Sequence, residues 1–186
     1  MRAITKERLF EDSNFRDDFA RLRGVSLNPE RHTAPNALAH AELVAQRAAE
    51  LAALNGLSSA ETHTLVALAY VHDVGKIGGT ARPSASVELL PRYGITDAVF
   101  VELVRYHDVN LPWWQSSQRG EPPTDKAWRK LAARVDVRML CLFMVADRAD
   151  CPGGFRANSA LTWFLGEAAQ RGLIPKALQL EEVDHV

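Results

Sequence analysis

The sequence predicts an all-α protein, a compact helical bundle whose loops are of modest length. Apolar residues recur every three or four positions along most of the chain, which is the spacing of one face of an α-helix. Helix start and stop signals bracket these segments. The sequence contains no alternating strand pattern, internal repeat or low-complexity tract.

The first two predicted helices lie before residue 57. The apolar face of the first is formed by Phe15, Phe19 and Leu22. Gly24 closes it, and the second helix begins at Pro35, a residue favoured in a first helical turn. The apolar face of the second helix is formed by Ala37, Ala41, Val44, Ala48 and Leu51. Asn55 and Gly56 are a typical helix end.

The middle of the chain carries a strong helix start signal. Ser58 and Glu61 have the spacing of a capping box, which predicts a helix covering residues 64–73. A loop rich in Gly, Pro and Ser follows over residues 78–86, and then a short helical piece around residues 87–90.

The second half of the chain is predicted to be helical with one long irregular connection. A helix is expected over residues 96–107. The irregular connection comprises Pro112 and the polar stretch 115–123. A helical run follows over residues 124–150, broken near Asp136 and stopped by Cys-Pro-Gly-Gly, and a final helix covers residues 158–171.

Length and composition indicate one ordinary globular domain over residues 1–186. The chain is 47% hydrophobic and 24% charged, with a formal net charge of -1. This balance argues against a strong overall attraction to nucleic acid or to anionic membranes. The longest apolar run, residues 139–146, is too short to span a bilayer. Because the N-terminus has no signal-like apolar core and Cys141 is expected to be a buried free thiol, we expect a cytoplasmic protein.

The most informative feature is the adjacent pair His72-Asp73, at the end of a very apolar helix and directly before Gly75 and Lys76. Burial of either titratable side chain without a partner costs several kcal/mol. A divalent metal ion would compensate that cost. We therefore expect further ligands elsewhere in the chain.

Two other side chains fit this expectation. His40 lies on the apolar stripe of its helix, and Asp147 shares a face with the apolar run 139–146. Taken alone, such a histidine is more often a hydrogen-bonded core residue, and Asp147 could pair with Arg148 or Arg134. The joint order His, His-Asp, Asp is far more specific. Imidazole and carboxylate ligands together suit a divalent transition metal with open positions for water and substrate.

With these residues in place, the chain resembles the HD-domain metal-dependent phosphohydrolases, whose signature is H…HD…D. The phrases His-Ala-Glu-Leu-Val-Ala from His40, His-Asp-Val-Gly-Lys from His72 and Ala-Asp-Arg around Asp147 also match. The resemblance covers about residues 36–155, which implies an HD-domain core with N- and C-terminal helical extensions. Residues 104–154 are most similar to the HD domains attached to tRNA nucleotidyltransferases, although these 186 residues lack the strand pattern expected of a nucleotidyltransferase domain.

The resemblance implies a divalent metal cofactor, of which Mn, Ni, Co, Fe, Zn and Mg are the candidates. Its implied ligands are His40, His72, Asp73 and Asp147. Asp150 lies one helical turn after Asp147 and is an alternative fourth ligand. The spacing from Gly153 favours Asp150, whereas the Ala-Asp-Arg phrase favours Asp147. We expect Asp147 to be the fourth ligand.

Several side chains have candidate roles in catalysis or substrate binding. Asp73 could act as general base as well as ligand. Lys76 could neutralise a phosphate, or could be a solvated lysine near a helix C-terminus. His107 could contact the substrate phosphate, act as general acid or bind a second ion, or could be a core histidine. Arg105 is a further candidate for substrate binding.

Weaker signals come from His32, His63, His185, Trp113 and Trp114. His32 precedes the helix of His40 and could approach the site, whereas His63 is expected to be exposed. The two tryptophans are expected to anchor a loop on the bundle rather than to stack on a nucleobase.

The expected function is hydrolysis of a phosphomonoester or (cyclic) phosphodiester bond in a small nucleotide-like substrate by a metal-activated water. One alternative is a non-catalytic regulatory module that keeps the metal and senses a nucleotide or an RNA end. Another is an HD-fold enzyme of a different class, such as a hydratase or an oxygenase. The complete ligand set together with Lys76 favours the phosphohydrolase.

Overall fold

The computed structural model describes residues 4–175 and 178–180, and within them the protein is helical and contains no β-strand, which confirms the all-α prediction. The α-helices are α1 (Lys6–Glu11), α2 (Ser13–Arg21), α3 (Ala37–Leu54), α4 (Ser59–Val71), α5 (Pro83–Leu89), α6 (Ala98–Tyr106), α7 (Asn110–Gln118), α8 (Asp125–Ala132), α9 (Val137–Ala146) and α10 (Ser159–Gln170). Four short 3-10 helices are η1 (Leu22–Gly24), η2 (Val74–Gly78), η3 (Leu90–Tyr93) and η4 (Phe155–Ala157).

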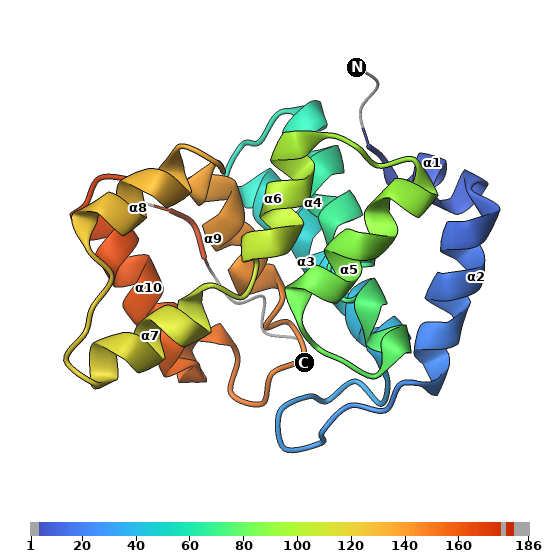
Figure 1. The fold of residues 1–186 in the computed structure, drawn as a ribbon, viewed down its shortest axis with the longest axis horizontal. Coiled ribbons are helices and arrows are strands. Elements are labelled where there is room, and N and C mark those ends of the chain that lie inside the picture. Colours follow the sequence, from blue (N-terminus) through green and yellow to red (C-terminus); the bar gives the residue numbers. More distant parts are fainter. Residues whose placement is uncertain (1–3, 176–177, 181–186) are drawn as a thin grey trace.

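Helix α9 lies in the middle of the molecule and packs against α3, α4 and α10 (Figure 1). Every residue of α9 except Arg138 is buried, which explains why its sequence is apolar on all sides. Helices α3 and α4 lie side by side, α1 and α2 cover one end of the bundle, and α7, α8 and α10 form the other. In the described part of the chain no helix is both long and apolar enough to cross a membrane.

Capping side chains set the helix boundaries. Asn36 caps α3 by accepting a hydrogen bond from the Ala39 N–H, so the expected start at Pro35 is wrong because the side-chain cap follows the proline. Ser58 and Glu61 form the predicted capping box, and α4 begins directly after Ser58. Asp136 caps α9 and so produces the predicted break in the long helical run.

Two sequence-based expectations on irregular segments are wrong. Helix α7 occupies much of the expected connection, because Trp113 packs against Trp128 of α8 and Phe164 of α10, with ring centroids 4.8 and 6.0 Å away. Pro112 sits in the first turn of α7, where a proline costs no internal hydrogen bond. Helix α5 likewise begins at Pro83, inside the expected loop. Trp113 is therefore a packing anchor, but on a helix.

The end of α4 positions the His-Asp pair. The α-helix stops at Val71, His72 is its C-cap, and Asp73 leads into η2. The backbone of η2 lies so close to α5 that a Cβ atom on Gly75 would lie 2.6 Å from the carbonyl carbon of Ala85. The Gly75 N–H also donates a hydrogen bond of 3.0 Å to the Ser86 Oγ. The next residue, Lys76, places its Nζ beside the Asp73 Oδ2.

Candidate metal centre

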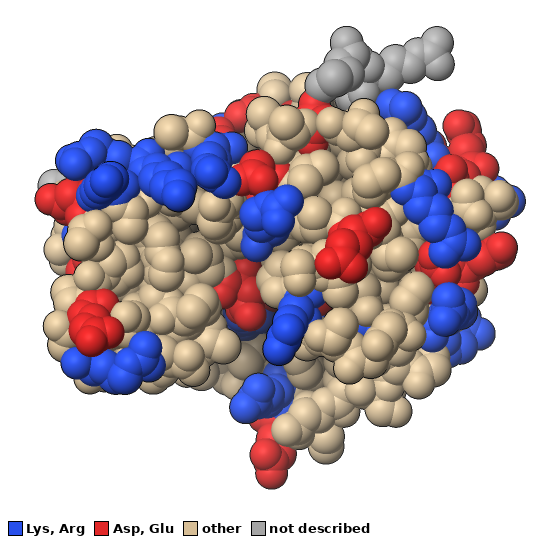
Figure 2. Space-filling view, in the orientation of Figure 1, with Lys and Arg blue, Asp and Glu red and all other residues tan. Residues whose placement is uncertain are grey.

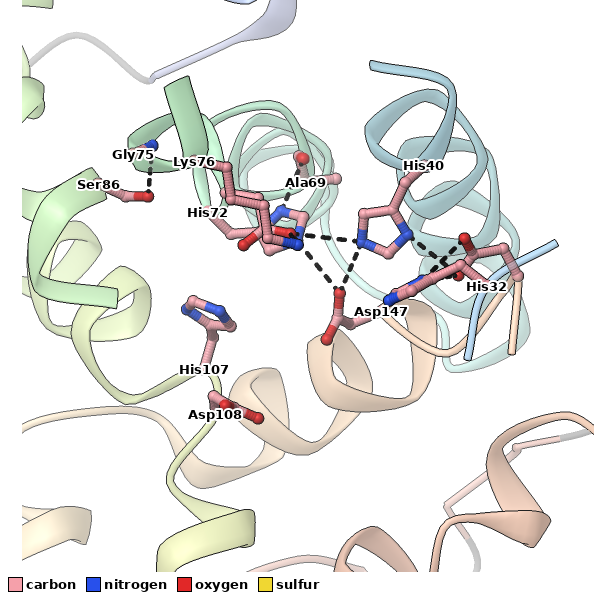
Figure 3. A network of polar contacts seen from close by, with 12 residues as sticks. His32, His40, Ala69, His72, Gly75, Lys76, Ser86, His107, Asp108 and Asp147 are labelled. Carbon is pink, nitrogen blue, oxygen red and sulfur yellow. Dashed lines mark hydrogen bonds and ion pairs between the residues drawn. The ribbon is translucent and has the colours of Figure 1, made fainter. Parts of the chain in front are cut away.

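The four expected ligands come together at one point, where α4 and α9 end beside α3 (Figure 3). The Asp147 Oδ1 lies 3.1 Å from the His40 Nε2 and 3.1 Å from the His72 Nε2. The Asp73 Oδ2 lies 3.2 Å from the His72 Nε2 and 3.7 Å from the His40 Nε2. All four side chains are buried. Two imidazole nitrogens and two carboxylate oxygens therefore face one another across a small volume.

The geometry of His72 fits a metal ligand. Its Nδ1 lies 2.9 Å from the Ala69 carbonyl oxygen, which can only accept, so the Nδ1 carries a proton and donates it. The Nε2 is buried and has no partner with hydrogen-bond geometry among the described residues, although carboxylate oxygens of Asp73 and Asp147 lie near it. A buried nitrogen that lies near carboxylates without bonding to them fits convergence on a shared ion.

Neighbouring charges shift the pKa values of His72 and Asp73 in opposite directions. Burial opposes charge on His72, but Asp73 and Asp147 outweigh it and raise the pKa of His72 to about 10. Burial also opposes charge on Asp73, but the positive charges of His72 and Lys76 lower the pKa of this carboxyl. Lys76 is the closest of these partners, with its Nζ 2.5 Å from the Asp73 Oδ2. Without a metal the site is therefore held as a network of ion pairs.

Asp147 is ionised by similar contacts. Burial works against its charge, but the Arg148 guanidinium and the nearby rings of His40 and His72 hold the pKa of Asp147 well below its usual range. The Arg148 Nη1 lies 2.5 Å from the Asp147 Oδ2, and the Nη2 lies 3.5 Å from the Asp108 Oδ1. For His40, burial is likewise outweighed by Asp147 and Asp150, which raise its pKa.

Asp150 lies on the far side of His40 from the other ligands. Its Oδ1 is 3.0 Å from the His40 Nδ1, at an angle that departs from an ideal hydrogen bond. Its Oδ2 accepts a 3.0 Å hydrogen bond from the His32 Nδ1. The sequence suggested only that His32 could approach the site, because the spacing between residues 32 and 150 carries no signal that the two side chains meet.

The site opens into a polar cleft of about 470 Å³. His40, Asp73, Asp147 and Asp150 lie in its wall, and so do Arg31, Lys76, His107, Asp108 and Arg148. Basic and acidic side chains lie close together near the middle of the face shown in Figure 2. Charged groups of both signs therefore surround the candidate metal centre, which suits a charged ligand better than an apolar one.

His107 reaches the site, as one sequence-based alternative proposed. Its ring centroid lies 5.2 Å from that of His72, and its Nδ1 donates a 2.7 Å hydrogen bond to the Val104 carbonyl oxygen. The Nε2 therefore carries the lone pair. Burial and the positive charge of His72 both lower the pKa of His107, which favours the neutral ring.

The remaining candidates lie elsewhere. Arg105 forms an ion pair of 2.8 Å with Glu102 and is not among the cleft-lining residues that the structure describes. His63 is exposed on α4, as expected. His185 lies outside the described residues. Cys141 is buried and, like Cys151, a free thiol.

Two groups of side chains bring ligand atoms within 4.8 Å of one another, as a metal ion requires. They are His40, His72 and Asp73, and His32, His40 and Asp150. Neutral imidazole and carboxylate are the donors that divalent transition metals take in proteins. Comparisons of the chain with protein-family models, with curated proteins and with solved structures found no match.

Proposed function

We propose that the protein is a metal-dependent phosphohydrolase that cleaves a phosphomonoester or (cyclic) phosphodiester bond of a small, nucleotide-like substrate. The observation that carries the proposal is the convergence of His40, His72, Asp73 and Asp147 at the base of a charged cleft, where the Nε2 of His72 lies near two carboxylates without hydrogen-bond geometry to either. His40, His72, Asp73 and Asp147 would hold the ion. A divalent ion bound there would supply a water of lowered pKa and a Lewis acid for the phosphoryl group.

In the proposed reaction Asp73 takes the proton of the attacking water. The Asp73 Oδ2 lies on the side of the carboxylate that faces the two imidazole rings of the candidate metal centre. Lys76 holds this carboxylate in place through their 2.5 Å contact. A carboxylate in such a position needs no further proton transfer before it can accept one.

Two cations are placed to bind the phosphate group. Lys76 and Arg148 both line the cleft, and each already contacts a carboxylate of the candidate metal centre. Charge that develops on the phosphoryl oxygens would be neutralised at this position. Arg148, which sequence reasoning treated only as a partner of Asp147, is therefore part of the proposed substrate site.

The neutral state of His107 favours a role as hydrogen-bond acceptor or ligand over a role as general acid. A lowered pKa makes this ring a poor general acid at neutral pH, because it rarely carries a second proton. Its Nε2 lone pair can accept a hydrogen bond from the substrate or bind a second ion. We therefore assign His107 to substrate positioning in the cleft rather than to protonation of the leaving group.

The test is a hydrolysis screen on protein stripped with a chelator and reloaded with Mn, Ni, Co, Fe, Zn or Mg. Substrates are p-nitrophenyl phosphate, bis-p-nitrophenyl phosphate, nucleoside monophosphates and 2′,3′-cyclic nucleotides. We expect metal-dependent turnover that His72→Ala abolishes together with metal content. His63→Ala, at an exposed histidine of the same helix, is the matched control and should behave as the wild type.

Turnover that persists in His72→Ala would refute the proposed site. If no metal supports turnover of any of these substrates but the protein binds a nucleotide measurably, the alternative of a non-catalytic regulatory module would replace the proposed enzymatic function. The cytoplasmic location expected from the sequence stays a prediction, which fractionation of cells would test.

A further inference from the structure

His32, Asp150 and His40 form a continuous chain that reaches the candidate metal centre from outside. The His32 Nδ1 contacts both oxygens of Asp150, at 3.2 and 3.0 Å, and the Asp150 Oδ1 lies 3.0 Å from the His40 Nδ1. The ring of His40 then presents its Nε2 to Asp147. In Figure 3 the rings of His32 and His40 lie close together beside Asp147.

The contact between Asp150 and His40 suits binding of an ion at the opposite nitrogen of the ring. A histidine that binds an ion through its Nε2 carries its ring proton on the Nδ1, and an ionised carboxylate beside that nitrogen can accept it in a hydrogen bond. The Nε2 then presents its lone pair to the metal centre.

We propose that Asp150 and His32 are positioning residues, which orient His40 for metal binding without ligating the ion themselves. This rests on the metal site of the proposed function and extends it beyond the four ligands. It also resolves the choice between Asp147 and Asp150. Asp147 touches the Nε2 atoms of both His40 and His72, whereas Asp150 touches the opposite nitrogen of His40.

The chain also ties a surface loop to the metal centre. His32 lies in the segment between η1 and α3, and the Thr33 N–H of the same segment donates a 2.7 Å hydrogen bond to the Asp150 carbonyl oxygen. Side chain and backbone of Asp150 therefore both hold this loop. Ser26 and Asn36 close its base through an antiparallel bridge.

The test measures metal affinity rather than activity. Purified apoprotein is titrated with Ni²⁺ or Co²⁺ against a chromophoric chelator, and the visible spectrum of the Co²⁺ form is recorded. Loss of an outer partner of a metal-bound histidine weakens affinity about 10- to 100-fold. We expect this loss in Asp150→Ala, a smaller one in Asp150→Asn, whose amide oxygen still accepts from the Nδ1, and a changed Co²⁺ spectrum in both.

Asp18→Asn is the matched control. Asp18 is as buried as Asp150, each with 2% of its surface exposed, and it is held by Arg21, Arg92 and Tyr93 far from the cleft. The Asp18→Asn variant should be less stable than the wild type but should keep the wild-type metal affinity and Co²⁺ spectrum. This separates orientation of His40 from a general loss of stability.

His32→Ala keeps the inference testable if Asp150→Ala fails to fold, because His32 is partly exposed. It should weaken metal binding and make the loop easier to cleave with trypsin after Arg31. Wild-type affinity and spectrum in Asp150→Asn and His32→Ala, with binding lost in His72→Ala, would overturn the positioning role and leave the metal site intact. Binding that survives His72→Ala would instead refute the site on which the proposed function depends.

Discussion

The packing of Gly75 against α5 leads to a sharp prediction on stability. In Gly75→Ala the new methyl carbon would lie 2.6 and 2.7 Å from the carbonyl carbon and Cβ of Ala85, and closer still to the backbone nitrogen of Ser86. These atoms belong to the backbone and first side-chain carbon of a helix, so the whole of α5 must move. Overpacking of this kind costs about 1–3 kcal/mol.

Movement of α5 also breaks the hydrogen bond from the Gly75 N–H to the Ser86 Oγ, worth about 1 kcal/mol. The free energy of unfolding should therefore fall by about 2–4 kcal/mol in total. For a chain of this length the melting temperature should fall by about 4–16 °C. Urea unfolding followed by circular dichroism measures the first quantity, and a thermal scan measures the second.

Gly78→Ala is the matched control, since both glycines lie in η2 and a Cβ on Gly78 would meet no heavy atom within 4 Å. Its backbone dihedral φ is not in the left-handed region, so the exchange should change stability by less than about 1 kcal/mol, toward stabilisation. Equal unfolding free energies for the two variants would refute the packing argument.

Three further predictions concern pH, capping and the thiols. Because the pKa of His72 in the folded protein is about 10, against an ordinary value of 6.5, its charge stabilises the metal-free protein fully below pH 6.5, and this contribution is lost as pH rises to 10. Urea titrations of metal-free protein should show it, and a stability that rises between about pH 7 and 9 would contradict it. Ser58→Ala should lower the free energy of unfolding by about 1 kcal/mol, because it removes the side-chain cap of the helix that ends at His72. Ser117→Ala, in which the lost hydroxyl caps none of the described helices, is the comparison in the same urea assay. Burial raises the pKa of the Cys141 thiol, so Ellman's reagent should modify only the partly exposed Cys151 in the folded protein, and equal rates for both thiols would contradict this.

Helical periodicity and capping signals predicted most of the fold because both are local. The capping box at Ser58 and the break at Asp136 are confirmed. Helix α7 was missed because its sequence, Asn-Leu-Pro-Trp-Trp-Gln-Ser-Ser-Gln, carries little apolar periodicity, and its stability comes from the contact of Trp113 with α8 and α10. Packing between distant segments overrides weak local preference in such cases.

The same reasoning from the sequence predicted only part of the candidate site. His40, His72, Asp73 and Asp147 stand out because polar residues on apolar helix faces are rare, and the structure brings them together. The contact of His32 with Asp150 could not be foreseen, because a histidine in a polar loop breaks no pattern. Arg105 was proposed from proximity in sequence to His107, but one helical turn places it beside Glu102 instead.

The ion pairs of the candidate site also imply that binding of a metal and binding of an anion are coupled. Lys76 contacts Asp73 and Arg148 contacts Asp147, so each of these two proposed ligands is already paired with a cation. An incoming metal ion competes for these carboxylates and leaves the two side chains free to receive an anion. Metal and phosphate should therefore bind with positive coupling, and by linkage each should raise the affinity of the other by the same factor. A metal titration repeated in the presence of inorganic phosphate would measure that factor.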